Sequence, residues 1–196
     1  MAGLLTAIRR AQDRLLHTGR HAAAISSVRR RESPHTVLVV CHGNICRSPY
    51  AAAILHRELS LSGVNIESAG FIGPGRPSPL AARREAAEHG IDLERHRSRV
   101  LSPDLVSRAS LVITMDTRQA SAVAQLYAKL PRDIFVLGDF DPLHGEARAI
   151  QDPIDQPAEV YRRVYTRIDR CAMVLAQTIL AETGPVSSSG NLSRES

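Results

Sequence analysis

Hydrophobic and polar positions along the chain follow two patterns in turn. Short apolar runs lie at 36–40, 64–68, 110–115 and 133–137, and the first is typical of a strand buried on both faces of a parallel sheet. Apolar residues at helical spacing predict helices over 48–61, 80–89, 117–129 and 158–183, with a further short helix that begins at Ser102-Pro103. Strands that alternate with helices predict an α/β fold, a three-layer sandwich with a central four-stranded parallel sheet.

The two ends of the chain depart from this alternation. Residues 4–16 carry apolar side chains at helical spacing with charged residues between them, which predicts an amphipathic helix, whereas 17–34 lose the pattern and resemble a linker. The last residues are rich in serine and glycine. We therefore predict an N-terminal arm over 1–34 that is partly helical or disordered, one domain over 35–183, and a disordered tail over 184–196.

The distribution of charge agrees with this division. Residues 1–34 contain seven arginines and two acidic residues, whereas the other 162 residues contain 18 basic and 18 acidic side chains. The net charge of +5 therefore belongs to the arm, and the domain is balanced. The arm has no interleaved aromatic residues, which argues against specific nucleic-acid binding. A solvated extension, a helix on an anionic membrane and a helix on an acidic partner remain open.

Three further features of the composition concern location. No apolar run approaches the length of a membrane span, and no apolar stretch of the kind found in secretory signals follows the first arginines. The three cysteines are sparse and odd in number, which argues against a disulfide scaffold and favours a reducing compartment. We expect a cytoplasmic protein.

The candidate chemistry lies where the first strand ends, because ligands of parallel sheets bind at the carboxyl ends of the strands. The segment from Cys41 to Pro49 reads CHGNICRSP and joins a buried strand to a helix, with Ser48 as candidate N-cap. Backbone amides in such a loop can curl around one point, next to the positive end of the helix dipole, and form an anion site. Gly43 is expected to give the loop a conformation that a Cβ would forbid.

A cysteine inside an anion site is suited to nucleophilic catalysis. The loop favours the Cys41 thiolate and holds a tetrahedral oxyanion above the sulfur, while Arg47 clamps two oxygens in a bidentate fork. Asn44 can hold the shape of the loop, and the Ser48 hydroxyl can donate to the thiolate. The predicted phosphate-binding residues are His42, Gly43, Asn44, Ile45, Cys46 and Ser48, and the chemistry requires no metal and no cofactor.

At these residues the sequence resembles the low-molecular-weight protein tyrosine phosphatases. The segment at 40–51, VCHGNICRSPYA, is similar to the signature of this family. The resemblance continues through Ser68-Ala69-Gly70, the segment His96-Arg97-Ser98-Arg99, the strand-end segment Ile113–Asp116, and Asp152-Pro153. It spans about residues 35–182 and implies a metal-independent phosphomonoesterase that works through a phosphocysteine on Cys41, with a phosphotyrosine protein as substrate.

The resemblance also implies a general acid that lies shortly before the last helix. This position selects Asp152 over Asp141, which also precedes a proline, and over Asp155. It further implies that Cys46 can form a reversible disulfide with Cys41 and that His96 supports a loop. Cys171 lies among apolar residues of the last helix and is expected in the core.

The walls of the substrate site depart from the family pattern. Ile154 and Asp155 follow the Asp-Pro pair, where aromatic residues are usual, and Phe71 either substitutes for them or packs in the core. Ile45 fits the tyrosine-specific members, because a threonine there would have indicated the arginine-phosphate branch. A thiol-coupled arsenate reductase and a catalytically silent oxyanion-binding regulator stay as alternatives, although no cysteine lies between Cys46 and Cys171 for a thiol relay.

Overall fold

One parallel sheet of four strands forms the centre of the protein. The structure is a computed structural model that describes residues 2–32, 34–144 and 146–181, with side chains from Leu16 onward. The strands are β1 (Thr36–Cys41), β2 (Asn65–Gly70), β3 (Leu111–Thr114) and β4 (Ile134–Val136), in the order β2-β1-β3-β4. Each strand pairs in parallel with its neighbours, which confirms the predicted α/β fold with a four-stranded parallel sheet.

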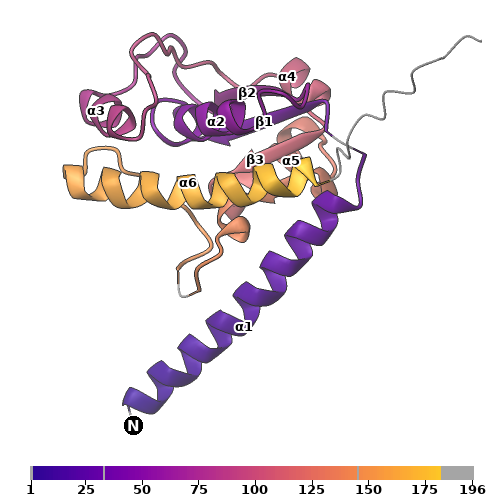
Figure 1. The fold of residues 1–196 in the computed structure, drawn as a ribbon, viewed down its shortest axis with the longest axis vertical. Coiled ribbons are helices and arrows are strands. Elements are labelled where there is room, and N and C mark those ends of the chain that lie inside the picture. Colours follow the sequence, from indigo (N-terminus) through magenta and orange to yellow (C-terminus); the bar gives the residue numbers. More distant parts are fainter. Residues whose placement is uncertain (1, 33, 145, 182–196) are drawn as a thin grey trace, which may run out of the picture.

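Helices cover both faces of this sheet (Figure 1). Side chains of β1 alternate between the faces: Val37 and Val39 join the larger core, and Leu38 and Val40 join a second core. The larger core is completed by α2 (Arg47–Glu58), α3 (Leu80–Glu88) and α6 (Ala158–Leu180), and the second by α4 (Pro103–Arg108) and α5 (Thr117–Tyr127). All five residues from Val37 to Cys41 are almost inaccessible to solvent, as expected for a strand covered on both faces.

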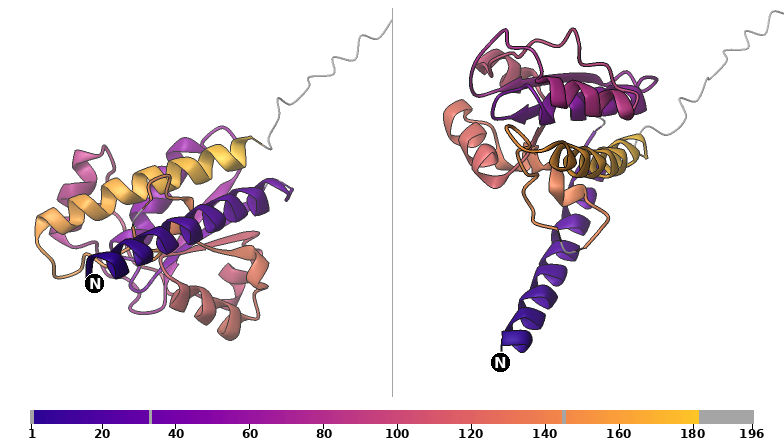
Figure 2. Two further views of the ribbon diagram at one scale, coloured as in Figure 1. Left: turned by 90° about the horizontal axis from the view of Figure 1, so that it is seen from below. Right: turned by 90° about the vertical axis from the view of Figure 1, so that its left-hand side faces the viewer.

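The N-terminal segment is one long helix, α1 (Ala2–Arg29), so the prediction of a linker from residue 17 is wrong up to residue 29. Its C-terminal half lies beside α6 and the short 3-10 helix η2 (Leu137–Phe140), and its N-terminal half extends away from the sandwich (Figures 1 and 2). The buried positions His17, Ala24 and Val28 share one helical face with the half-buried His21. Because three of these four residues are histidine or alanine, the buried face does not stand out as an apolar helical periodicity in the sequence.

Several boundaries differ from the expected ones in ways that matter for the site. Strand β2 continues to Gly70 and so includes the whole Ser68-Ala69-Gly70 motif. Between the predicted strand at 133–137 and the predicted helix at 158–183, the structure adds the short 3-10 helix η2. Ser48 is not the N-cap of α2, since Cys46 holds that position and Ser48 lies inside the first turn. The predicted tail lies outside the described residues, and none of the described helices is long and apolar enough to cross a membrane.

Candidate active site

The loop after β1 is as tight as the sequence suggests. Cys41 is the last residue of β1 and Arg47 the first residue of α2, so the turn is made by 42–46 alone. The left-handed backbone conformation falls on Asn44, with φ of 49°, and not on Gly43 as expected. Asparagine adopts this conformation more readily than most residues. At Gly43 the nearest atom to an added Cβ would be Nη2 of Arg76, at 2.9 Å, which is the far end of a flexible side chain.

Hydrogen bonds to the Asn44 side chain hold the loop in this conformation. Its Nδ2 donates to the hydroxyls of Ser48 and Ser68, each at 2.9 Å, and its Oδ1 accepts from the backbone N–H of Arg99 at 2.8 Å. Nε2 of His96 lies 2.7 Å from the Asn44 carbonyl oxygen. The side chain and carbonyl of Asn44, both buried in the fold, thus connect the loop to α2, to β2 and to the segment 96–99.

Gly70 at the end of β2 lies directly against the loop. A Cβ at this position would lie 2.7 Å from the backbone nitrogen of Asn44 and 2.9 Å from the carbonyl oxygen of His42, which are backbone atoms that cannot rotate away. The next residue, Phe71, donates its N–H to the same His42 oxygen at 2.8 Å. The Ser68-Ala69-Gly70 motif therefore supplies both a hydroxyl for Asn44 and the space in which the loop turns.

The loop directs donors at the sulfur of Cys41. The Asn44 N–H points to Sγ at 3.3 Å, and the Ser48 hydroxyl lies 3.0 Å from it. Both donors, together with the N-terminus of α2, stabilise negative charge on this sulfur. The second loop cysteine differs, because burial, reinforced by charge on Cys41, raises the pKa of Cys46 to about 12. At neutral pH, Cys46 is therefore a protonated thiol beside the candidate nucleophile.

A cavity of about 190 Å³ opens over the loop. Its lining brings together distant parts of the chain: Cys41, His42, Gly43, Ile45, Cys46, Arg47, Ile72, Arg76, Asp152 and Ile154. Arg47 is buried, forms an ion pair with Asp152, and donates from Nη1 to the Ile150 carbonyl at 3.2 Å. The structure thus places a thiol, a guanidinium and a carboxyl group around one small space.

The three candidate acids have different environments. Asp152 lines the cavity, and its side chain is 39% exposed. Asp141 is fully buried, and both its oxygens bind the guanidinium groups of Arg167 and Arg170 at 2.7–3.0 Å. Burial alone would raise the pKa of Asp141, but the hydrogen bonds from Arg170 and Arg167 outweigh it and hold this pKa below the ordinary carboxyl value. Asp141 is therefore a structural anchor, and the exposed Asp155 does not line the cavity.

The walls of the cavity are aliphatic. Ile45, Ile72 and Ile154 supply its apolar surface, while Phe71 packs against the second core and does not line it. Arg76 was missed in the sequence analysis, although it lines the cavity and donates to the Gly43 carbonyl at 3.0 Å. In the sequence, Arg76 could have been noticed as the single charged residue of the glycine- and proline-rich segment 70–79 that follows β2. Cys171 is fully buried in the larger core, as expected.

An α/β sandwich with a cysteine and an arginine in an anion-binding loop after the first strand defines a class of proteins that hold a tetrahedral oxyanion against a thiol. Within this class, the chain belongs to the low molecular weight phosphotyrosine protein phosphatase family, whose model matches residues 36–184. Cys41 occupies the position of the loop cysteine of this family of hydrolases.

Individual relatives agree with this assignment. The chain is 39% identical to a protein of Ralstonia nicotianae named probable low molecular weight protein-tyrosine-phosphatase EpsP, over 61% of this chain and 86% of that protein. The solved structure of YwlE arginine phosphatase from Geobacillus stearothermophilus is 31% identical with a TM-score of 0.69, covering 76% of this chain and 96% of the other. Vibrio vulnificus Wzb in complex with benzylphosphonate is 28% identical with a TM-score of 0.66, covering 73% and 97%.

Proposed function

We propose that the protein hydrolyses phosphotyrosine in protein substrates through a phosphocysteine on Cys41. The observation that carries this proposal is the convergence of Cys41, Arg47 and Asp152 on one cavity, with the loop and helix donors directed at the sulfur. Two relatives support it, since one is named as a protein-tyrosine-phosphatase and the other binds a benzylphosphonate.

The first half of the reaction forms the covalent intermediate. The Cys41 thiolate attacks phosphorus, an S–P bond forms, and the P–O bond to the tyrosine breaks. Arg47 binds two equatorial oxygens of the phosphoryl group and stabilises their charge in the transition state. The phosphoryl group displaces Asp152 from the Arg47 guanidinium, with which Asp152 forms an ion pair in the free enzyme. The released Asp152 carboxyl, in its acid form, then protonates the leaving oxygen.

The second half returns the enzyme to its starting state. The Asp152 carboxylate removes a proton from a water molecule, which attacks the phosphocysteine and releases inorganic phosphate. Cys41 leaves as a thiolate, and the nearby Ser48 hydroxyl stabilises it as the S–P bond breaks. His42, Gly43, Ile45 and Cys46 would contribute their backbone amides to the phosphate site. Because the mechanism needs reduced Cys41, we also propose that the protein works in the cytoplasm.

The aliphatic walls give a second candidate substrate, phosphoarginine. Ile72 and Ile154 offer no aromatic ring on which a tyrosine could stack, and one structural relative is an arginine phosphatase. Ile45 favours the first candidate, because it fits the tyrosine-specific members. A thiol-coupled arsenate reductase has less support, because Cys171 is fully buried and burial raises the pKa of its thiol.

A panel of matched peptides tests this function. Phosphotyrosine, phosphoserine, phosphothreonine and phosphoarginine versions of one peptide are assayed for phosphate release by wild type and Cys41→Ser. We expect the highest kcat/KM on the phosphotyrosine peptide and no turnover by Cys41→Ser. A preference for the phosphoarginine peptide would show that phosphoarginine, the second candidate, is the substrate. Full turnover by Cys41→Ser would exclude the phosphocysteine mechanism.

A further inference from the structure

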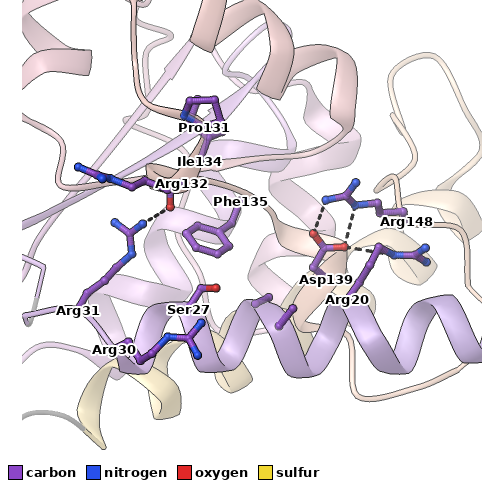
Figure 3. A pocket seen from close by; sticks show the side chains of 12 residues that line it. Arg20, Ser27, Arg30, Arg31, Pro131, Arg132, Ile134, Phe135, Asp139 and Arg148 are labelled. Carbon is purple, nitrogen blue, oxygen red and sulfur yellow. Dashed lines mark hydrogen bonds and ion pairs between the residues drawn. The ribbon is translucent and has the colours of Figure 1, made fainter.

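A second and larger cavity, of about 480 Å³, lies between the C-terminal half of α1 and the segment 131–139 (Figure 3). It is lined by Arg20, Ala23, Ala24, Ser27, Arg30, Arg31, Pro131, Arg132, Ile134, Phe135, Asp139 and Arg148. None of these residues lines the cavity over Cys41. Four of them belong to α1, and Arg30 and Arg31 directly follow it. These six residues precede the segment matched by the family model, so the cavity is formed jointly by the family domain and the N-terminal segment.

The cavity is rich in guanidinium groups. Five arginines line it, and Asp139 is the one carboxylate among the lining residues. Asp139 is shared: Arg148 binds it in a bidentate manner at 2.7 and 2.8 Å, and Nε of Arg20 lies 3.7 Å away. One carboxylate therefore faces two cations at this end of the cavity.

The other end of the cavity has a similar imbalance. Asp133 lies just outside the lining and binds Arg31 at 2.6 Å, with Nε of Arg132 at 4.0 Å. Arg30 donates to the neutral Ser26 hydroxyl at 2.8 Å. Five guanidinium groups thus meet two carboxylates, and the excess of about three positive charges attracts a multiply charged anion.

The floor between these two ends is apolar. Figure 3 shows the Phe135 ring between Arg31 and Arg132 on one side and the group formed by Arg20, Asp139 and Arg148 on the other. The guanidinium carbon of Arg31 lies 5.6 Å from the centre of the Phe135 ring. Ala23, Ala24, Pro131 and Ile134 complete the apolar surface. Such a floor suits a flat group, which can pack on an aromatic ring and on guanidinium planes.

We propose that this cavity is a binding site for a phosphate-bearing polyanion with a planar body, of the class of nucleoside di- and triphosphates. The excess charge matches a polyphosphate chain, arginine forks are suited to phosphate oxygens, and the floor accommodates the ring. The volume lies within the range of about 300–1,000 Å³ typical of small-molecule sites. The proposal does not depend on the phosphatase reaction, because the two cavities share no residue.

Calorimetric titration of the full chain with ATP, at fixed ionic strength and without divalent metal, tests the proposal. The variant is Arg30→Gln/Arg132→Gln, which leaves the Cys41 loop intact. Arg30 donates to a neutral hydroxyl, and the ion pair of Arg132, at 4.0 Å, is the longest among the lining arginines. The matched control is Arg84→Gln/Arg95→Gln, which removes two exposed arginines that line neither cavity. We expect the affinity for ATP to fall by about tenfold or more in the cavity variant and to stay unchanged in the control. Equal affinities of all three proteins, or equal losses in both variants, would overturn the proposal.

Tripolyphosphate separates the contribution of the planar group from that of charge. We expect it to bind at least about fivefold more weakly than ATP, and Phe135→Leu to remove this difference. Equal affinity of wild type for the two ligands would contradict a site for a planar body. Phosphatidylserine vesicles and a polyglutamate peptide are tested with the same variants. Arginine-dependent binding of either one without binding of ATP would assign the cavity to a macromolecule and overturn the proposal.

Discussion

Arg47 and Asp152 form an ion pair although 105 residues separate them in the sequence. One begins α2 and is buried, and the other lies on the segment before α6 and is partly exposed. The pair joins the group that would bind phosphate to the group that would move protons. In the proposed mechanism, a phosphoryl group bound to Arg47 replaces this contact, which would link phosphate binding to proton transfer.

We expect Asp152→Asn to lower kcat for phosphotyrosine by roughly a hundredfold to ten-thousandfold, since it removes the proposed proton donor. The loss is expected to be smaller for aryl phosphates with acidic leaving groups, which need less protonation. Steady-state rates on a series of substituted phenyl phosphates measure this dependence. Asp155→Asn is the control, because it changes the same side chain at an exposed position with φ of 56°, which asparagine tolerates. A similar loss in both variants would remove Asp152 from the role of acid.

Gly70→Ala is expected to reduce kcat/KM by about tenfold or more, because small displacements of a positioned reactive group have effects of this size. The added Cβ would lie 2.7 Å from the Asn44 nitrogen and must displace the loop around Cys41. Gly19→Ala serves as control, since a Cβ at this position on α1 has no atom within 4 Å. Kinetics on 4-nitrophenyl phosphate compare the two. Wild-type kinetics of Gly70→Ala would show that the close approach of β2 does not shape the loop.

Asp141→Asn is expected to destabilise the fold by about 3–5 kcal/mol, because it leaves Arg167 and Arg170 without their buried counter-charge. The folded-state pKa of Asp141 is lowered, so its contribution is complete above the ordinary carboxyl pKa of about 4 and is lost as pH falls through the lower folded-state value. Urea unfolding between pH 2 and 7 should thus show a weaker loss of stability in acid for Asp141→Asn than for wild type. Glu159→Gln, at an exposed ion pair, should change neither the free energy of unfolding at neutral pH nor its dependence on pH.

The docking of α1 changes what we expect of the N-terminal segment. The sequence left open whether the arm is solvated or lies on a membrane or a partner. Because Val28 does not line the cavity over Cys41, we expect Val28→Ala to leave turnover of a small aryl phosphate unchanged. Stability should differ, because Val28 is 3% exposed and belongs to the larger core. We expect Val28→Ala to cost about 2 kcal/mol, which corresponds to a fall in Tm of roughly 4–8 °C for a chain of this size. Leu16→Ala on the same helix, at 58% exposure, should cost less than about 0.5 kcal/mol. Equal values of Tm for the two variants would contradict the docking of α1 on the core.

Features that depend on residues close together in the chain could be predicted without the structure. The apolar run at 36–40 and the helical spacings predicted the parallel sheet, because periodicity records which faces are buried. The loop from Cys41 to Arg47 could be predicted as an anion site, since one turn between a strand and a helix brings its residues together. The family resemblance already selected Asp152 over Asp141 by its position before the last helix. What surrounds each carboxyl could be learned only from the tertiary structure, because their arginine partners lie far away in the chain. Tertiary structure also decided that α1 docks, that Arg76 reaches the loop and that five arginines line one cavity. Burial and the pairing of charges depend on segments that meet only when the chain folds.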